Sequence, residues 1–262
     1  MKRSGMLLLI GLLAAPAGAD DAAAKVMECM RANVPPQLSI GMLELTVYDR
    51  VGGSRQLKGR MFTRKEQGGD KGLMHASLRI DAPAEFKGAA YLVRETDDYL
   101  RDGMFVYLPA VKRVRRVTGS FADASLMGTN FSYFDFKQLQ NAFGDLSASV
   151  EPAEHINGRP VHVLSFKALP GTETRYTRVK AWIDQQACVA VRAEFHEGKK
   201  LAKELSSLPG SLKQAGATWY VAEIEMRDLS AGTRTVLRMG KLESERAPAN
   251  RYFDPNAFFM GP

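Results

Sequence analysis

The chain has 262 residues, of which 45% are hydrophobic and 25% charged, and its formal net charge is +7. This composition is ordinary for a globular protein and excludes disorder as the main state. The chain has no run of about 20 consecutive apolar residues, which a membrane-spanning helix needs, and its two cysteines exclude a disulfide-rich scaffold or a multi-zinc protein.

The first 19 residues predict a secretory signal peptide. Lys2 and Arg3 give a positive start, residues 6–15 form a short apolar run, and residues 17–19 form a small-residue cleavage site. Cleavage after Ala19 would leave residues 20–262 as one exported domain. Because Cys29 lies ten residues beyond that site, lipid attachment at the new N-terminus is not expected.

The next segment predicts one helix over residues 22–33, with Val26 and Met30 on one side, ending before the proline pair at 35–36. From there on, apolar and polar residues alternate, which is typical of half-buried strands. The clearest of these strands cover residues 43–48, 55–63, 73–80, 104–108, 175–183, 189–195 and 235–242.

Two further segments have local signals. Asn157 and Gly158 separate two alternating segments and predict a two-residue hairpin turn. A second helix is expected over residues 136–143, and residues 208–214 are expected to form a helical turn or a loop.

The fold class that follows is mainly β: an open, strongly curved antiparallel barrel of about 10–11 strands, with a few helices packed on it. The concave face of such a sheet must be filled by side chains, a helix or a bound ligand. Methionines on or beside the strands serve either as core packing or as an adaptable apolar surface. They include Met42, Met61, Met74, Met104, Met127, Met226 and Met239.

Signals for an enzyme are weak. The four histidines, at positions 75, 155, 162 and 196, lie in no HExxH motif, and the chain has no GxSxG elbow and no phosphate-binding loop. We therefore expect no catalytic residue, no metal and no cofactor.

The segment from Lys112 to Tyr133 is unusual because it is long, rich in apolar residues and starts with four cations in five positions. Its apolar side chains form either a lid over a ligand cavity or a plug that completes the core. Trp182 and Trp219 are expected to line the same cavity or to pack in the core. The predicted cavity and lid residues are Phe121, Leu126, Met127, Phe131, Tyr133, Trp182 and Trp219.

The four cations are Lys112, Arg113, Arg115 and Arg116. Alternation places them on both faces of a strand, so they either contact a phosphate headgroup or an acidic partner, or protect an exposed sheet edge. Residues 1–19 hold two basic and no acidic residues, so the net charge falls from +7 to +5 on cleavage. This diffuse excess favours an anionic lipid surface over nucleic acid.

Several motifs resemble the LolA-like family of outer-membrane lipoprotein-sorting proteins, and in particular its branch found beside RND-superfamily exporters. One departure is Phe134, where the resemblance leads us to expect an acidic residue; Asp135 follows one place later. The segments that carry the resemblance are LPA at 108–110, KRVRRV at 112–117, GS at 119–120, MGTNFSY at 127–133, INGRP at 156–160, AWID at 181–184, RAEF at 192–195 and RYFDP at 251–255.

The resemblance implies an open barrel whose helices cover an apolar cavity, in a monomeric periplasmic carrier of the acyl chains of lipoproteins or lipids. The alternative is a non-carrier accessory subunit of an RND-superfamily exporter. Independently of the resemblance, export places Cys29 and Cys188 in an oxidising compartment, so we expect them to form a disulfide rather than two separate buried thiols.

Overall fold

The computed structural model describes residues 17–66, 73–96, 98–139, 145–245 and 250–260. Most of the predicted signal peptide, residues 1–16, lies outside the described residues. Helix α1 (Ala17–Ala32) begins before the predicted cleavage site and ends one residue short of the predicted helix end. No described helix has the length and apolar character that a membrane span requires.

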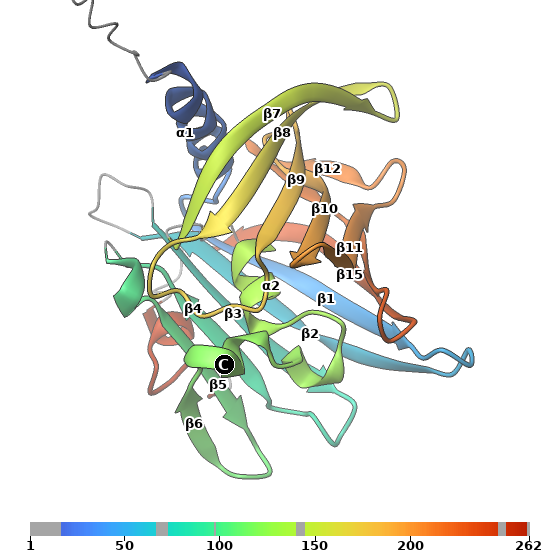
Figure 1. The fold of residues 1–262 in the computed structure, drawn as a ribbon. Coiled ribbons are helices and arrows are strands. Elements are labelled where there is room, and N and C mark those ends of the chain that lie inside the picture. Colours follow the sequence, from blue (N-terminus) through green and yellow to red (C-terminus); the bar gives the residue numbers. More distant parts are fainter. Residues whose placement is uncertain (1–16, 67–72, 97, 140–144, 246–249, 261–262) are drawn as a thin grey trace, which may run out of the picture.

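Thirteen strands of the described chain form one antiparallel sheet, in the order β6-β5-β4-β3-β2-β1-β15-β14-β11-β10-β9-β8-β7 (Figure 1). The strands are β1 (Leu38–Tyr48), β2 (Ser54–Lys65), β3 (Met74–Ala82), β4 (Ala90–Arg94), β5 (Gly103–Leu108), β6 (Arg113–Arg116), β7 (Leu146–Ile156), β8 (Arg159–Ala168), β9 (Arg178–Asp184), β10 (Ala190–Glu197), β11 (Lys200–Ser207), β14 (Glu223–Asp228) and β15 (Thr233–Glu245).

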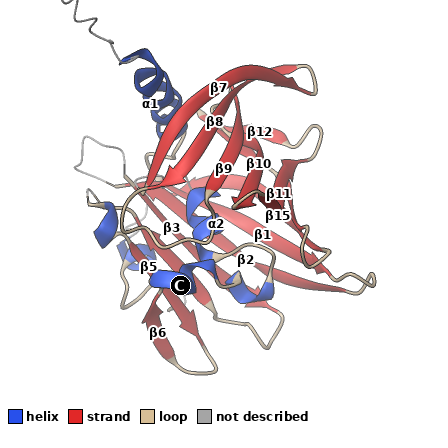
Figure 2. Cartoon of the chain, in the orientation of Figure 1, coloured by secondary structure: helices blue, strands red, loops and turns tan. Residues whose placement is uncertain are grey.

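The sheet curves strongly but does not close, since β6 and β7 are its two edges (Figure 2). This confirms the predicted open antiparallel architecture. Asn157 (φ 52°) and Gly158 (φ 77°) both take the left-handed conformation that a two-residue hairpin turn demands, and they join β7 to β8.

The predicted number of strands was too low. Besides the 13-stranded sheet, β12 (Leu212–Ala215) and β13 (Thr218–Val221) form a separate two-stranded hairpin. Part of this hairpin lies where a loop or helical turn was expected. Four-residue strands offer too few positions for alternation to show, so a sequence pattern of period two misses them.

Helix α2 (Tyr133–Leu139) lies inside the curve of the sheet (Figure 1). It starts three residues before the predicted helix, and the predicted end beyond Leu139 falls outside the described residues. Its start is set by reciprocal capping: the Ser132 Oγ accepts from the Asp135 backbone N–H (3.0 Å), and the Ser132 N–H donates to Asp135 Oδ2 (2.8 Å).

The main core fills the concave side of the sheet, between the strands and the two helices. A smaller cluster joins Leu38, Phe62, Ala90 and Leu92 to the C-terminal segment around Phe253. That segment begins with the 3₁₀ helix η4 (Asn250–Phe253) and packs in this smaller cluster, separate from the main core.

Candidate functional site

A cavity of about 190 Å³ lies inside the curve of the sheet, lined mostly by apolar side chains. Its walls come from α1, α2, β13 and the inward-facing residues of nine strands of the large sheet: β2, β3, β7–β11, β14 and β15. Examples are Leu139, Phe166, Phe195, Leu205, Ile224 and Leu237.

Small side chains on two neighbouring strands keep this space open. Ala181 on β9 and Ala190 and Ala193 on β10 all line the cavity, with Val179 and Phe195 at the alternate positions. Residues two apart in a strand share a face, which places Val179 with Ala181 and Ala193 with Phe195. The register shift between Ala190 and Arg192 brings Ala190 to the same face. Alanine at these positions leaves volume that a larger apolar residue would fill.

Methionine side chains form another part of the wall. Met61, Met74 and Met239, three of the methionines singled out on the strands, line the cavity together with Met30 of α1. Met42 instead lies on the surface and is 58% exposed. Because methionine is flexible and polarizable, this wall can adapt to apolar guests of different shape.

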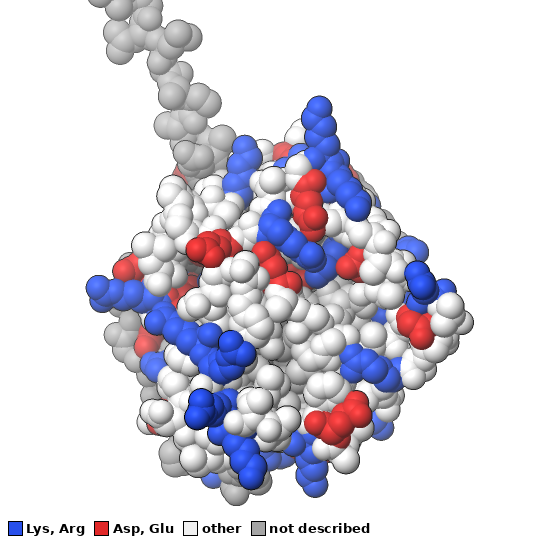
Figure 3. Space-filling view, turned by 60° about the horizontal axis from the view of Figure 1, so that its bottom comes forward, with Lys and Arg blue, Asp and Glu red and all other residues white. Residues whose placement is uncertain are grey.

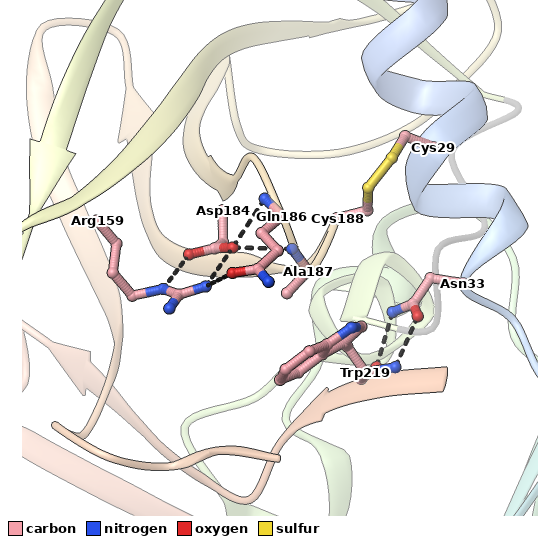
Figure 4. The surroundings of a disulfide bond; sticks show 8 residues. All are labelled: Cys29, Asn33, Arg159, Asp184, Gln186, Ala187, Cys188 and Trp219. Carbon is pink, nitrogen blue, oxygen red and sulfur yellow. Dashed lines mark hydrogen bonds and ion pairs between the residues drawn. A yellow bond between two sulfur atoms is a disulfide. The ribbon is translucent and has the colours of Figure 1, made fainter. Parts of the chain in front are cut away.

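The end of α1 forms one side of the cavity through Met30, Asn33 and Val34. Cys29 is joined to Cys188 by a disulfide, with their Cα atoms 5.6 Å apart (Figure 4). Arg31 pairs with the buried Glu95 through two hydrogen bonds of 2.7 and 3.0 Å. Both contacts hold α1 against the sheet.

Asn33 connects α1 to the β12–β13 hairpin. Its Nδ2 donates to the Trp219 carbonyl and its Oδ1 accepts from the Trp219 N–H, both at 2.7 Å (Figure 4). The amide thus satisfies both backbone groups of Trp219, whose side chain lines the cavity.

The turn that presents Cys188 is built by Asp184. Its carboxylate accepts from the backbone N–H groups of Gln186 (3.0 Å) and Ala187 (2.8 Å) and pairs with Arg159 (Figure 4). Burial alone would raise the pKa of Asp184, but Arg159 and the backbone donors outweigh it and hold the pKa below its usual range.

The two predicted tryptophans lie in different surroundings. Trp219 lines the cavity. Trp182 lies on the outer face, because Ala181 one position earlier already faces inward. There its Nε1 donates to Glu154 (2.9 Å), and Lys180 and Arg192 lie 4.7 and 4.6 Å from its ring. Trp182 is only 3% exposed and belongs to the main core cluster, so core packing, rather than the cavity wall, is its place.

The lid candidates between β6 and α2 occupy the core rather than the cavity wall. This segment contains the 3₁₀ helices η2 (Gly119–Asp123) and η3 (Leu126–Gly128). It packs beside α2, where Tyr91 donates its hydroxyl to the Tyr133 carbonyl (2.9 Å). The core cluster includes Leu126, Met127, Phe131 and Tyr133, and the partly buried Phe121 packs against it. None of these five residues is in the cavity lining described.

The four predicted cations are all exposed on the β5–β6 hairpin, away from the cavity. Arg115 lies 5.3 Å from the ring of Phe121, and Arg116 donates to the Asp102 carbonyl (3.4 Å). Figure 3 brings this side forward and shows basic side chains gathered at its lower left, with few acidic ones among them. The structure therefore separates the basic surface from the apolar cavity.

Several wall residues were missed from the sequence, chiefly the alanines of β9 and β10 and the polar residues Asp135 and Gln138 of α2. The small residues Ala181 and Ala193, in strands of otherwise larger apolar residues, are a signal that could have located the cavity. No group of side chains suited to hold a metal ion occurs among the described residues.

Comparison with known proteins agrees with this architecture. A model for a family described as an uncharacterized protein matches residues 72–258. A DUF1329 family protein from Desulfovibrio piger superposes with a TM-score of 0.80 at 23% identity, over 91% of this chain and 98% of that one. A search of curated proteins finds no match.

Two other solved structures share the fold. A domain described as an outer membrane lipoprotein-sorting protein, from Vibrio parahaemolyticus, has a TM-score of 0.79 at 21% identity, over 92% of this chain and all of that one. A LolA superfamily protein from Nitrosomonas europaea has a TM-score of 0.66 at 17% identity, over 88% and 97%. The chain thus belongs to the family of uncharacterized proteins that this model describes, and it has the same fold as these three solved structures.

Proposed function

We propose that this protein is a periplasmic carrier that binds acyl chains of lipoproteins or lipids and passes them toward the outer membrane. The observation that carries this proposal is the apolar cavity inside the curved sheet. Each methylene that moves from water into such a site contributes about 0.8 kcal/mol. A cavity that takes up the methylenes of an acyl chain therefore offsets the free energy that holds the same methylenes in a membrane.

The cavity volume sets a condition on binding. About 190 Å³ is below the roughly 300–1,000 Å³ usual for ligand pockets, so a long acyl chain requires the walls to move apart. The methionine side chains are the part best suited to move, since α1 is held by the disulfide and by Arg31, and Asn33 ties the β12–β13 hairpin to the end of α1.

The exposed cations give the carrier a place to contact a membrane. Lys112, Arg113, Arg115 and Arg116 extend along an edge strand beside Val111, which is 54% exposed. Basic residues near an anionic bilayer are each worth about 1 kcal/mol. We propose that this hairpin contacts lipid headgroups or an acidic partner surface while cargo is exchanged.

Fluorescent fatty-acid uptake by delipidated protein tests the carrier role. Ala193→Phe places a ring in the cavity and is expected to weaken uptake at least about tenfold, because the ring occupies the space of several methylenes. Ala231→Phe, in the exposed β14–β15 turn, is the matched control and should bind like the wild type. Wild-type protein that takes up no fatty acid would contradict the carrier and favour the accessory subunit of an RND-superfamily exporter.

A further inference from the structure

The turns of four β-hairpins lie at one end of the large sheet, from the β14–β15 turn at the right to the β5–β6 turn at the bottom of Figure 1. Strands joined by hairpins place alternate turns at the same end of an antiparallel sheet. The β1–β2, β3–β4 and β5–β6 turns therefore share an end, and β15, the partner of β1, adds the β14–β15 turn. We call this surface the hairpin rim; it comprises residues 49–53, 83–89, 109–113 and 227–232.

Contacts between neighbouring turns make the hairpin rim continuous. Gly232 of the β14–β15 turn lies beside Arg50 of the β1–β2 turn, where a Cβ on the glycine is 3.9 Å from the Cβ of the arginine. The Arg55 guanidinium, at the start of β2, lies 5.8 Å from the centre of the Phe86 ring in the β3–β4 turn. That turn in turn lies against Pro109 of the β5–β6 turn. The four turns therefore form one surface.

Three turns of the hairpin rim expose an aliphatic side chain. Val51 is 85% exposed, Val111 54% and Leu229 43%. An aspartate fixes the shape of two of these turns. Asp49 Oδ1 accepts from the Val51 N–H (2.8 Å), and Asp228 Oδ1 accepts from the two backbone N–H groups after Leu229 (2.9 and 2.8 Å). The hydrogen bonds hold these aliphatic residues at the tips of their turns.

Cations flank the exposed tips. The hairpin rim has five exposed basic side chains and two exposed acidic ones, Asp49 and Glu85. This excess attracts an anionic surface. The five exposed cations are Arg50, Lys87, Lys112, Arg113 and Arg227.

We propose that the hairpin rim docks on an anionic bilayer, with Val51, Val111 and Leu229 entering the headgroup region and the cations contacting lipid phosphates. A protein partner requires a closely packed, shape-complementary patch. The hairpin rim instead offers single aliphatic side chains on separate turns, and lipids can rearrange around each of them. The docking surface rests on the proposed carrier function, and it extends the membrane contact from the β5–β6 hairpin to four turns.

Sedimentation with vesicles of phosphatidylcholine and phosphatidylglycerol tests the docking surface. Val51→Ser with Val111→Ser and Leu229→Ser removes the three aliphatic tips and keeps every cation. This triple variant is expected to bind the anionic vesicles at least about tenfold more weakly than the wild type, because three apolar side chains no longer leave water. Vesicles of phosphatidylcholine alone should bind the wild type much more weakly, because they carry no net charge.

The matched control removes three exposed aliphatic side chains that lie outside the hairpin rim. Leu100→Ser with Val150→Ser and Leu208→Ser should bind the anionic vesicles like the wild type. Thermal unfolding verifies that both triple variants fold.

Equal binding by the rim variant and the wild type overturns the docking surface. Wild-type protein that binds no anionic vesicle also overturns it, and leaves an acidic protein as the partner of the cations. Fatty-acid uptake without vesicles separates this result from failure of the carrier, since the rim variant should take up fatty acid like the wild type. Wild-type protein without uptake contradicts the carrier, whereas the vesicle comparison decides the docking surface.

Discussion

His75 shows at the scale of one residue how the fold controls charge. The ring is 4% exposed. Burial, then Arg94 and Arg64, lower its pKa from 6.5 to about 4. The folded protein therefore keeps His75 neutral at pH values where the unfolded chain has already bound a proton.

This difference makes stability depend on pH. Above about pH 6.5 the histidine is neutral in both states; as the pH falls toward 4, only the unfolded state gains the proton, so stability is lost across that window, by about 3 kcal/mol in total. Urea unfolding of His75→Gln should show a correspondingly flatter profile between pH 7 and 4. His155→Gln, at an exposed site, is the control, and identical profiles for both variants would contradict the prediction.

The sequence predicted which residue types line the cavity, but it did not predict which face of a strand a given side chain lies on. Trp219 was expected at the cavity and lies there, whereas Trp182 lies on the outer face. Trp182 lies in an alternating segment, and nothing in that pattern says which face of the strand is concave. A shift of one position exchanges the faces of a strand.

At the scale of elements, the β5–β6 hairpin is the clearest separate unit. Its strand β6 (Arg113–Arg116) is an edge of the large sheet, and its cations are exposed. Charged side chains on an edge also hinder pairing with another chain, so exposure alone does not separate protection of the edge from membrane contact.

Charge reversal separates the two. Arg113→Glu with Arg115→Glu should weaken sedimentation with anionic liposomes at least about tenfold, because two attractive charges become repulsive. Lys199→Glu with Lys200→Glu makes the same charge change on the exposed β10–β11 turn and should have a much smaller effect. If both variants lose liposome binding equally, the loss comes from net charge alone, and the β5–β6 hairpin is not a specific membrane-contact surface.

Element boundaries were predictable where a local signal exists. The Asn157–Gly158 turn follows from the conformational freedom of those two residues. The start of α2 was missed, although Ser132 and Asp135 carry the spacing of a capping pair. The β12–β13 hairpin was missed because its two strands are only four residues long.

For the whole molecule, the alternating pattern predicted an open, curved sheet because a large amphipathic sheet must bury one face. It did not predict how full the concave side is. The core segment between β6 and α2 fills one part, while alanines on β9 and β10 leave the other part open. That balance depends on packing between residues far apart in the sequence, which a pattern along one strand does not contain.

The disulfide links α1 to the turn between β9 and β10, two parts of the fold that are 159 residues apart in the sequence. Closing a loop of that length stabilises by about 4–5 kcal/mol in the chain-entropy model, and measured effects are often about 2–4 kcal/mol. Cys29→Ser with Cys188→Ser should therefore lower the free energy of unfolding by the smaller amount, seen as a lower urea midpoint.

The double variant should also release a bound fluorescent fatty acid faster, since the end of α1 forms one side of the cavity through Met30, Asn33 and Val34. A reductant should reproduce both changes in the wild type and leave the double variant unchanged. If reduced and oxidised wild type unfold at the same urea concentration, the disulfide does not hold α1 in place.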